Sequence, residues 1–187
     1  FGNVTLAPKH AGGITEMSRQ LIQQSSPDVE ALIRGDLSAL LAQAIDAAII
    51  EGGGTNEPVG ILSTVGIQSA ALGTLTWPAI CAMVEKLELS NVDATAANWL
   101  VSAKSKTALS SKQTTTAANV MLMEGGKIAN IPAYSTNQLA NKTSILGRVL
   151  LGDFSQVLLG IWSEIDLLVN PFDSVAYARG GVLVRAM

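Results

Sequence analysis

Cysteine and histidine are each present only once in this chain, at Cys81 and His10. A lone cysteine excludes a disulfide within the chain and any metal cluster held by several thiolates. A lone histidine leaves a Ser–His–Asp hydrolase with a single candidate base, and no serine lies in a GxSxG sequence. No group of three or four ligating residues predicts a metal site. The sequence therefore lacks the commonest routes to metal binding and nucleophilic catalysis.

Charged residues are scarce as well. They make up 14% of the 187 residues, and the formal net charge is −3. The chain therefore has no overall positive field that would attract nucleic acid. Residues 94–123 contain Lys104, Lys106 and Lys112 and no acid. We interpret this segment as a solvated helix and loop, with contact to a polyanion as the alternative.

Long apolar runs are also missing. None approaches the roughly 18 residues that a membrane span requires. No signal peptide is found either, and the single cysteine is typical of a protein made and used in a reducing cytoplasm. The chain starts at Phe1 rather than at methionine, so we expect that something upstream has been cut away or lies outside this sequence.

Apolar residues, by contrast, are plentiful at 48%, although aromatic residues contribute only 4%. A chain of this length forms one good-sized domain or two small ones. Its composition argues against disorder, because disordered chains are rich in charge and poor in leucine and isoleucine. It predicts a buried core together with more apolar surface than a free monomer needs.

The clearest element is a helix over about residues 27–51. Ser26 is suited to cap its N-terminus, and Pro27 takes the first helical position. Apolar residues then recur every three or four positions, which predicts a continuous stripe on a helix of about 37 Å, long enough to back a sheet. Gly35 allows a bend. The stripe comprises Val29, Leu32, Ile33, Leu37, Leu40, Leu41, Ala44, Ile45, Ala48 and Ile49.

Shorter elements surround this helix. Val4 and Leu6 alternate with polar residues and predict an extended arm or strand. A second helix is expected from Thr76, which is suited to cap it, and a strand at 98–102 precedes a short helix that ends near Ser111.

Strands are expected mainly in the second half of the chain. A hairpin is predicted over residues 114–136, with its turn at Glu124–Gly125–Gly126. Further strands are predicted for RVLLGDF, QVLLGIW, EIDLLVNP, VAYAR and VLVRAM. The expected fold class is α+β, with helices early and an antiparallel sheet late.

The three glycines at 52–54 suggest a phosphate-binding loop. Such loops lie between a strand and the N-terminus of a helix, where free N–H groups meet the anion. Gly52, Gly53 and Gly54 instead follow a helix, whose terminal carbonyls repel phosphate. We interpret the loop as a helix stop, in which a glycine adopts the left-handed conformation and Pro58 prevents the helix from resuming.

Three further candidates have structural explanations. His10 is interpreted as a surface or interface residue, and Cys81, within the apolar stripe of the second helix, as a small core residue. Glu164 and Asp166 share a face of an expected strand, a pair that could cleave a glycoside but is more typical of a charged sheet edge. We expect no catalytic, cofactor-binding or metal-binding residue.

Two stretches resemble the major capsid proteins of tailed bacteriophages, the HK-type capsid fold that is shared with encapsulins. The first is MSRQLIQQSSPDVEALIRGDLSALLAQAIDAAIIEGGGTNEPVGIL, which is similar to the family's S-x-x-L lead-in, long helix and G-x-G-x-x-x-P-x-G-I loop. The second is GKIANIPAYST, followed by LLGDFSQVLLGIWSEIDLLVNPF and RGGVLVRAM. It resembles the family's G-x-P-V strand, G-D-F-S turn and terminal strand with an arginine, although Ala133 stands where valine is usual.

The resemblance implies an α+β phage major-capsid fold with a long spine helix, a peripheral antiparallel sheet and an axial α/β domain. Residues 1–16 would be the remnant of an extended loop or arm, and 17–65 the spine helix and peripheral domain. Residues 66–187 would form the axial domain, with some strands of about 148–187 returning to the peripheral sheet. Members usually carry an arm and a longer loop first, and only about half of that loop is present, near FGNVTLAPKHAGG.

The resemblance also implies a function. The chain would be a structural major capsid protein of a phage or prophage, without cofactor or enzymatic activity. Copies would assemble as pentamers and hexamers into an icosahedral shell enclosing DNA, which is contacted non-specifically at most. A scaffold segment or maturation protease would act upstream or in trans. The protein would reside in the virion capsid, and in the bacterial host cytoplasm during assembly, with no membrane partner.

Two other functions stay open. An encapsulin-like compartment would share the fold but enclose an enzyme cargo, and a small hydrolase would use His10 or the Glu164–Asp166 pair. Some capsid proteins also link their subunits through a lysine–asparagine bond. Its lysine is expected in the missing part of the loop, with Lys9 and Asn170 as the alternative.

Overall fold

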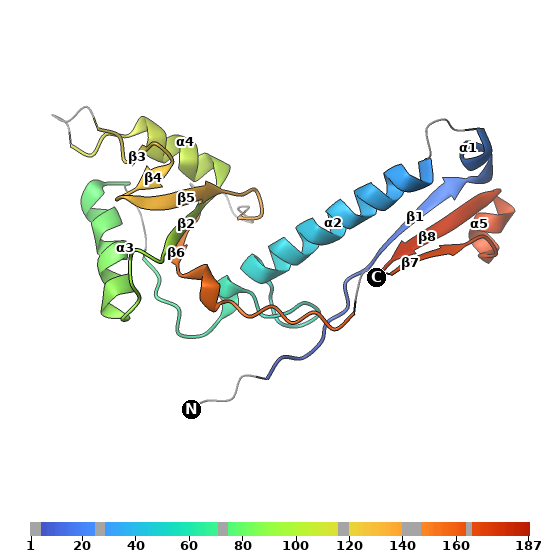
Figure 1. The fold of residues 1–187 in the computed structure, drawn as a ribbon, viewed down its shortest axis with the longest axis horizontal. Helices are drawn as coiled ribbons and strands as arrows, with labels where there is room; N and C mark the ends of the chain where they lie inside the picture. The colour runs from blue at the N-terminus through green and yellow to red at the C-terminus, as the bar shows by residue number, and fades with distance from the viewer. Residues whose placement is uncertain (1–4, 25–28, 71–74, 116–119, 140–146, 164–165) are drawn as a thin grey trace. The chain divides into compact units, whose positions relative to one another are not determined.

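The computed structural model describes residues 5–24, 29–70, 75–115, 120–139, 147–163 and 166–187. The chain forms two compact units (Figure 1). The first unit comprises Phe1–Ser63 and Gly160–Met187, and the second comprises Thr64–Leu159. The first unit is therefore built from both ends of the chain, and the second from its middle.

The first unit contains a three-stranded antiparallel sheet and one long helix. Its strands are β1 (Gly13–Ser18), β7 (Leu167–Asn170) and β8 (Gly181–Ala186), in the order β1-β8-β7. Figure 1 shows β8 lying between its two partners. The helices are α1 (Arg19–Gln24), α2 (Val29–Glu51) and α5 (Ser174–Ala178), with a 3-10 turn η1 at Ile61–Ser63.

The core of the first unit lies between α2 and one face of the sheet. Its buried members are Met17, Leu37, Leu41, Val184 and Ala186. Met17 comes from β1 and the last two from β8, so the helix packs across the pair of strands that joins the start of the chain to its end. Burial of these side chains is the main source of stability available to the unit.

The predicted long helix is confirmed, but its predicted stripe is only partly covered. The α2 residues that pack on the core step by four, at Val29, Ile33, Leu37 and Leu41. Such a row lies along one ridge of a helix. Leu32 and Leu40, which were placed in the same stripe, are each 59% exposed. A sheet of three strands covers a narrower face than the sequence pattern predicted. Ser26 and Pro27 lie outside the described residues.

The glycine loop ends α2 at Glu51, as predicted. The N–H of Gly52 donates to the Ala48 carbonyl (2.9 Å), and the N–H of Gly60 donates to the Gly52 carbonyl (2.9 Å). A side chain on Gly52 would overlap the carbonyl oxygens of Pro58 and Ala48. Close approach of backbone to backbone therefore explains Gly52, whereas the left-handed conformation is found further on, at Gly54 (φ 82°).

The second unit contains a five-stranded mixed sheet. The strands are β2 (Asn98–Val101), β3 (Met123–Glu124), β4 (Lys127–Ile128), β5 (Ile131–Ser135) and β6 (Val149–Gly152), in the order β3-β4-β5-β2-β6. Strands β2 and β5 are parallel, and the other pairs are antiparallel. Two helices, α3 (Trp77–Leu89) and α4 (Ala103–Ser111), and the 3-10 turn η2 (Phe154–Gln156) complete it.

Two tight turns shape strands β3 to β5. Gly125 and Gly126 have φ of 57° and 76°, and Ala129 and Asn130 have φ of 49° and 65°. Successive left-handed residues give hairpin turns whose twist matches that of the flanking strands. The predicted hairpin at residues 124–126 is confirmed. The second turn was not predicted, because alanine rarely adopts this conformation.

Trp99 is the largest fully buried side chain of the second unit. It is 1% exposed, and its indole N–H donates to the Ile128 carbonyl (3.0 Å), so its one polar atom is satisfied. The other buried core members are Ile80, Ala97, Val101, Leu109, Leu122, Met123, Ile128 and Ile131. They come from α3, the sheet, α4 and the adjoining loops, so one core organises the unit.

Several strand predictions are wrong. VAYAR lies largely in α5, because an Asp173 carboxylate oxygen accepts the N–H groups of Val175 and Ala176 and so caps a helix turn. Gln156 ends η2, and residues 157–163 belong to no strand. The late strands β6, β7 and β8 pair antiparallel with their neighbours, as expected, and the one parallel pair among the described strands is β2–β5.

The start of the chain also differs from expectation. Leu6 lies in a stretch without regular structure, and Val4 lies outside the described residues. The first strand is β1 instead, which pairs with β8 and crosses the boundary placed after residue 16. Thr76 precedes α3 as expected, but its side chain makes no capping hydrogen bond.

The buried ridge of α2 can be tested by truncation. We expect Leu37→Ala to lower the free energy of unfolding by about 2–4 kcal/mol, because it removes packed methyl groups and leaves a cavity. Leu40→Ala, which changes an exposed leucine one position from Leu41, should cost below about 1 kcal/mol. Urea unfolding followed by circular dichroism measures both, and equal losses would contradict the assigned helix face.

The close approach at Gly52 makes a second prediction. Gly52→Ala should lower the free energy of unfolding by about 2–3 kcal/mol, because the new methyl group meets backbone oxygens that cannot move aside. Gly35→Ala is the matched control. Nothing lies within 4 Å of a side chain placed there. It should stabilise the helix by about 0.5–1 kcal/mol. A neutral Gly52→Ala in the same urea titration would show that the loop is not closed as described.

Candidate functional surfaces

The lone histidine and cysteine both lie at the surface. His10 is exposed in the irregular stretch before β1, which agrees with the surface interpretation. Cys81 is exposed too, so its assignment to the core is wrong. On α3 the neighbouring Ile80 faces the core, and a residue one position further along a helix is rotated by about 100° away from that face.

The acid pair is described only in part. Glu164 lies outside the described residues, so no distance between the two carboxylates is defined. The backbone of Asp166 exchanges two hydrogen bonds of 3.0 Å with Met187, which extends the β7–β8 ladder. Within the described part of the chain, no three His, Cys, Asp or Glu side chains lie close enough to hold a metal ion.

The lysine-only segment does not form one basic patch. Lys104 and Lys106 lie two positions apart on α4, and residues with that spacing point to different sides of a helix. Lys112 follows the last helical turn, and all three side chains are exposed. This arrangement favours the interpretation as a solvated helix.

The two buried polar side chains among the described residues are serines with a structural role. The hydroxyls of Ser102 and Ser105 lie 3.0 Å apart, and that of Ser105 donates to the Arg148 carbonyl (3.1 Å). Gly147 leaves the space in which the Ser105 hydroxyl lies. These bonds attach the start of α4 to the chain that enters β6. This contact could not be predicted from the sequence, because it joins residues 43 positions apart.

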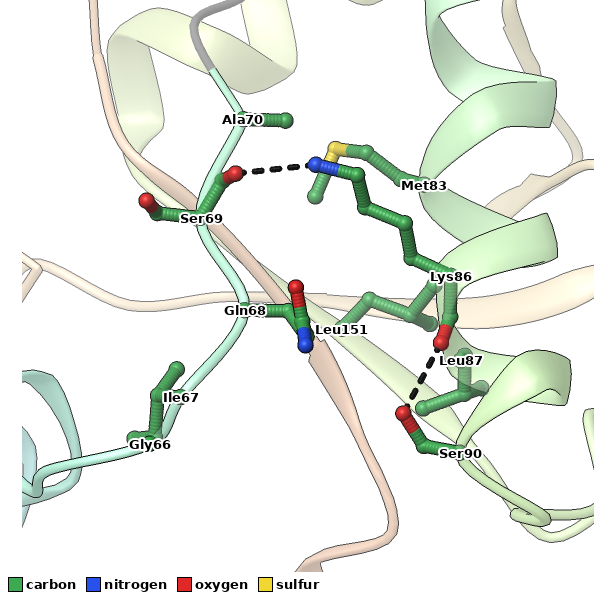
Figure 2. Close-up of a pocket in the computed structure, with 10 residues that line it drawn as sticks. All are labelled: Gly66, Ile67, Gln68, Ser69, Ala70, Met83, Lys86, Leu87, Ser90 and Leu151. Atoms are coloured by element: carbon green, nitrogen blue, oxygen red, sulfur yellow. Dashed lines mark hydrogen bonds between the residues drawn. The ribbon is translucent and has the colours of Figure 1, made fainter.

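The second unit has a shallow pocket between residues 66–70 and α3, shown in Figure 2. Its volume is about 290 Å³, at the small end for a ligand site. The one charged group in its lining, the Lys86 ammonium, donates to the Ser69 carbonyl (3.0 Å). The Ser90 hydroxyl donates to the Lys86 carbonyl (3.0 Å). The pocket therefore offers no set of converging polar groups for a cofactor.

The GDFS turn is held by one carboxylate. Asp153 accepts hydrogen bonds from the Ser155 hydroxyl (2.7 Å) and the Ser155 N–H (3.0 Å), and at 3.3 Å from the Gln156 amide. These bonds stabilise the charged form and hold the pKa of Asp153 below its usual value, with the Ser155 hydroxyl as the largest cause. The role is that of an N-cap for η2.

Exposed apolar side chains are the most prominent surface feature. Phe172, between β7 and α5, is 81% exposed, and Ile14 on β1 is 62% exposed. Others in the first unit are Leu6, Leu21, Ile22, Leu32, Leu40, Val59, Ile161, Trp162, Leu168, Val169, Val175 and Tyr177. Those in the second unit include Val65, Leu89, Val120, Tyr134 and Leu158. Large exposed apolar surface marks sites of protein contact.

None of the helices in the described residues is both long enough and apolar enough to cross a membrane. The described surface offers apolar area on helices, strand faces and extended chain. This is the arrangement expected of a protein that works through its contacts.

Comparison with known proteins agrees with that conclusion. The model of the phage capsid family matches residues 1–187. The major capsid protein of Halomonas phage phiHAP-1 is 28% identical over 189 residues, which cover 99% of this chain and 30% of that protein.

Solved structures show the same fold at low sequence identity. The capsid of a native GTA particle has a TM-score of 0.67 at 18% identity, and the match covers 94% of this chain and 65% of the capsid chain. A structure from Gordonia phage Cozz has a TM-score of 0.63 at 16% identity, and the match covers 94% of this chain and 63% of the phage chain. A structure from Mycobacterium phage Bobi has a TM-score of 0.67 at 13% identity, and the match covers 95% of this chain and 62% of the phage chain. The chain thus spans less than two thirds of each of these relatives.

The Asp153 turn gives a prediction that tests the local geometry. Ser155→Ala removes the largest cause of the shift, so the pKa of Asp153 should rise toward its usual value of about 3.9. Because the pKa is depressed in the folded state, the bonds stabilise the fold above about pH 4 and are lost as the pH falls below it. An NMR titration of the Asp153 carboxyl carbon measures the pKa. Gln156→Ala, which removes the smallest cause, is the control, and an unchanged pKa in Ser155→Ala would contradict the turn.

Proposed function

The chain belongs to the phage capsid family, and from that premise we propose that it is the shell-forming part of a structural major capsid protein of a phage or prophage. The observation that carries the proposal is the match of the family model to all 187 residues. The exposed apolar surface supports it independently, since a subunit of a shell must bury area against its neighbours.

The two units correspond to the domains that such a protein needs. We assign α2 as the spine helix and the first unit, with its β1-β8-β7 sheet, as the peripheral domain. The second unit, Thr64–Leu159, is the axial domain, which meets its neighbours around five- and six-fold axes. The irregular stretch before β1 is the remnant of the extended loop. These domain assignments rest on the family and are part of the proposal.

Assembly works by repetition. Each subunit makes several contacts of modest area, and a closed shell engages all of them at once. Simultaneous engagement turns individually weak contacts into a stable particle, because every bond after the first forms within an assembly that is already held together. Stability therefore comes from surface shape and apolar area, and no catalytic residue is required.

The partners follow from this role. The main partner is the chain itself, in pentamers and hexamers of an icosahedral shell. The net charge of −3 suits an inner surface that contacts packaged DNA non-specifically at most. A scaffold segment or maturation protease acts upstream or in trans. The protein resides in the virion and assembles in the cytoplasm of the bacterial host.

Electron microscopy tests the proposal directly. The complete protein, including any segments that precede or follow residues 1–187, should form closed particles of uniform size when it is expressed with its scaffold. Negative-stain images and the sedimentation profile measure this. A protein that stays monomeric at high concentration under these conditions would contradict the shell function.

A further inference from the structure

The two units have separate apolar cores. The buried members of the first core come from β1, α2 and β8, and those of the second lie between Ile80 and Ile131. No described residue belongs to both clusters. Because burial of apolar surface is the main favourable term in folding, each unit has a source of stability of its own.

The two cores differ in how completely they are buried. In the first unit the most deeply buried apolar side chains are those of Ala176 and Ala186, whereas the larger Leu37 and Met17 each stay 5% exposed. The largest fully buried side chains of the described residues all lie in the second unit, and they are Trp99, Ile80, Leu109, Leu122, Ile128, Leu139 and Val101. The free energy that opposes opening grows with the apolar area that opening exposes. The first unit is therefore the less stable of the two.

Strand β8 holds the first unit together. It pairs with β1 along Gly181–Ala186 and with β7 along Leu183–Ala186, and β1 and β7 are not neighbours in the sheet. Two of its side chains, Val184 and Ala186, pack in one cluster with residues of α2. Without β8 the two other strands have no partner in the sheet, and α2 loses part of the surface on which it packs.

Both ends of β8 are attached by backbone hydrogen bonds. Before the strand, the Arg19 N–H donates to the Gly180 carbonyl (2.9 Å). After it, Asp166 and Met187 exchange two bonds of 3.0 Å. These bonds continue the two ladders of β8, so they break together with them. The strand is thus attached along its whole length to elements of the first unit.

We propose that β8 is the closing strand of a conformational device. When this strand leaves the sheet, β1, β7 and α2 open with it as one cooperative unit, while the second unit stays folded. Opening exposes the apolar ridge of α2 and both edges of β1, so the chain can reach a state in which only its first unit is accessible. The proposal rests on the fold and does not depend on the shell function.

Hydrogen exchange of the unassembled full chain tests the cooperativity. The amides are followed by NMR while the guanidinium concentration is raised below the unfolding transition. The slowest amides of β1, α2 and β8 should converge on one opening constant, because one event exposes all of them. That constant should be at least tenfold larger than the one for the slowest amides of β2 and β5. One shared constant for both units, or separate constants for β1 and β8, would overturn the proposal.

A truncation in the closing strand tests its role. Val184 is 3% exposed, and Val184→Ala removes part of a packed side chain. The variant should accelerate exchange at least tenfold in β1 and α2, although the altered residue lies in β8. Exchange in β2 and β5 should stay within threefold of the parent. Acceleration confined to β8, or acceleration that includes β2 and β5, would contradict the device.

A second variant reverses the test. Val101 of β2 is fully buried in the core of the second unit. Val101→Ala should accelerate exchange at least tenfold in β2 and β5 and leave β1 and α2 within threefold of the parent. Equal acceleration in both units would show that the chain opens as a single domain.

The matched control lies one position from Val184. Arg185 is exposed on the outer face of the sheet, the face that points away from α2, in one row with Ile14 and Leu168. Arg185→Ala should leave exchange in every element within threefold of the parent, and a tenfold acceleration would show that β8 is not held by its inner face. If Val184→Ala does not fold, the exchange profile of the parent decides the question alone. The readout needs no particles, so a failure of the shell function leaves it unaffected.

Discussion

The packing of α2 on the β1–β8 pair is the contact on which the rest of the first unit depends. Leu37 and Leu41 pack in one cluster with Met17, Val184 and Ala186, so this small apolar cluster joins residues from the two ends of the chain. The outer sheet face points away from α2 because the inner face is buried there, and the glycine loop lies where the same helix ends. A loss at this cluster would therefore affect surfaces that contain none of its residues.

The sequence identified the elements whose signals are local. The α2 helix has a long apolar periodicity, and the 124–126 turn has two glycines. Errors arose where a long-range contact or a single side chain decided the outcome. VAYA has the composition of a strand, but the Asp173 carboxylate caps it as a helix. Leu32 and Leu40 fit the helical stripe, and only the narrow sheet shows that they stay exposed.

The exposed apolar surface was predictable from the composition only in amount, and not in its position on the fold. The resemblance of the sequence to capsid proteins is confirmed by the family match. The outer face could not be found in advance, because it depends on register. Only the pairing of Ile14 with Arg185 and of Arg185 with Leu168 brings residues 14, 168 and 185 into one row. Cys81 shows that a helix raises the same difficulty for prediction. Its neighbour Ile80 is in the core, whereas Cys81, one position further along the helix, is exposed.

The order of the strands along the chain also decides when each sheet can form during synthesis. All strands of the second unit lie within Thr64–Leu159, so that unit has its whole sheet while the ribosome is still making the remainder. The first unit must wait, because β8 is its central strand and is translated after the other two. Until Ala186 leaves the exit tunnel, β1 has no neighbour and the outer face does not exist. The sheet of the first unit therefore closes only after β8 has been synthesised, later than the sheet of the second unit.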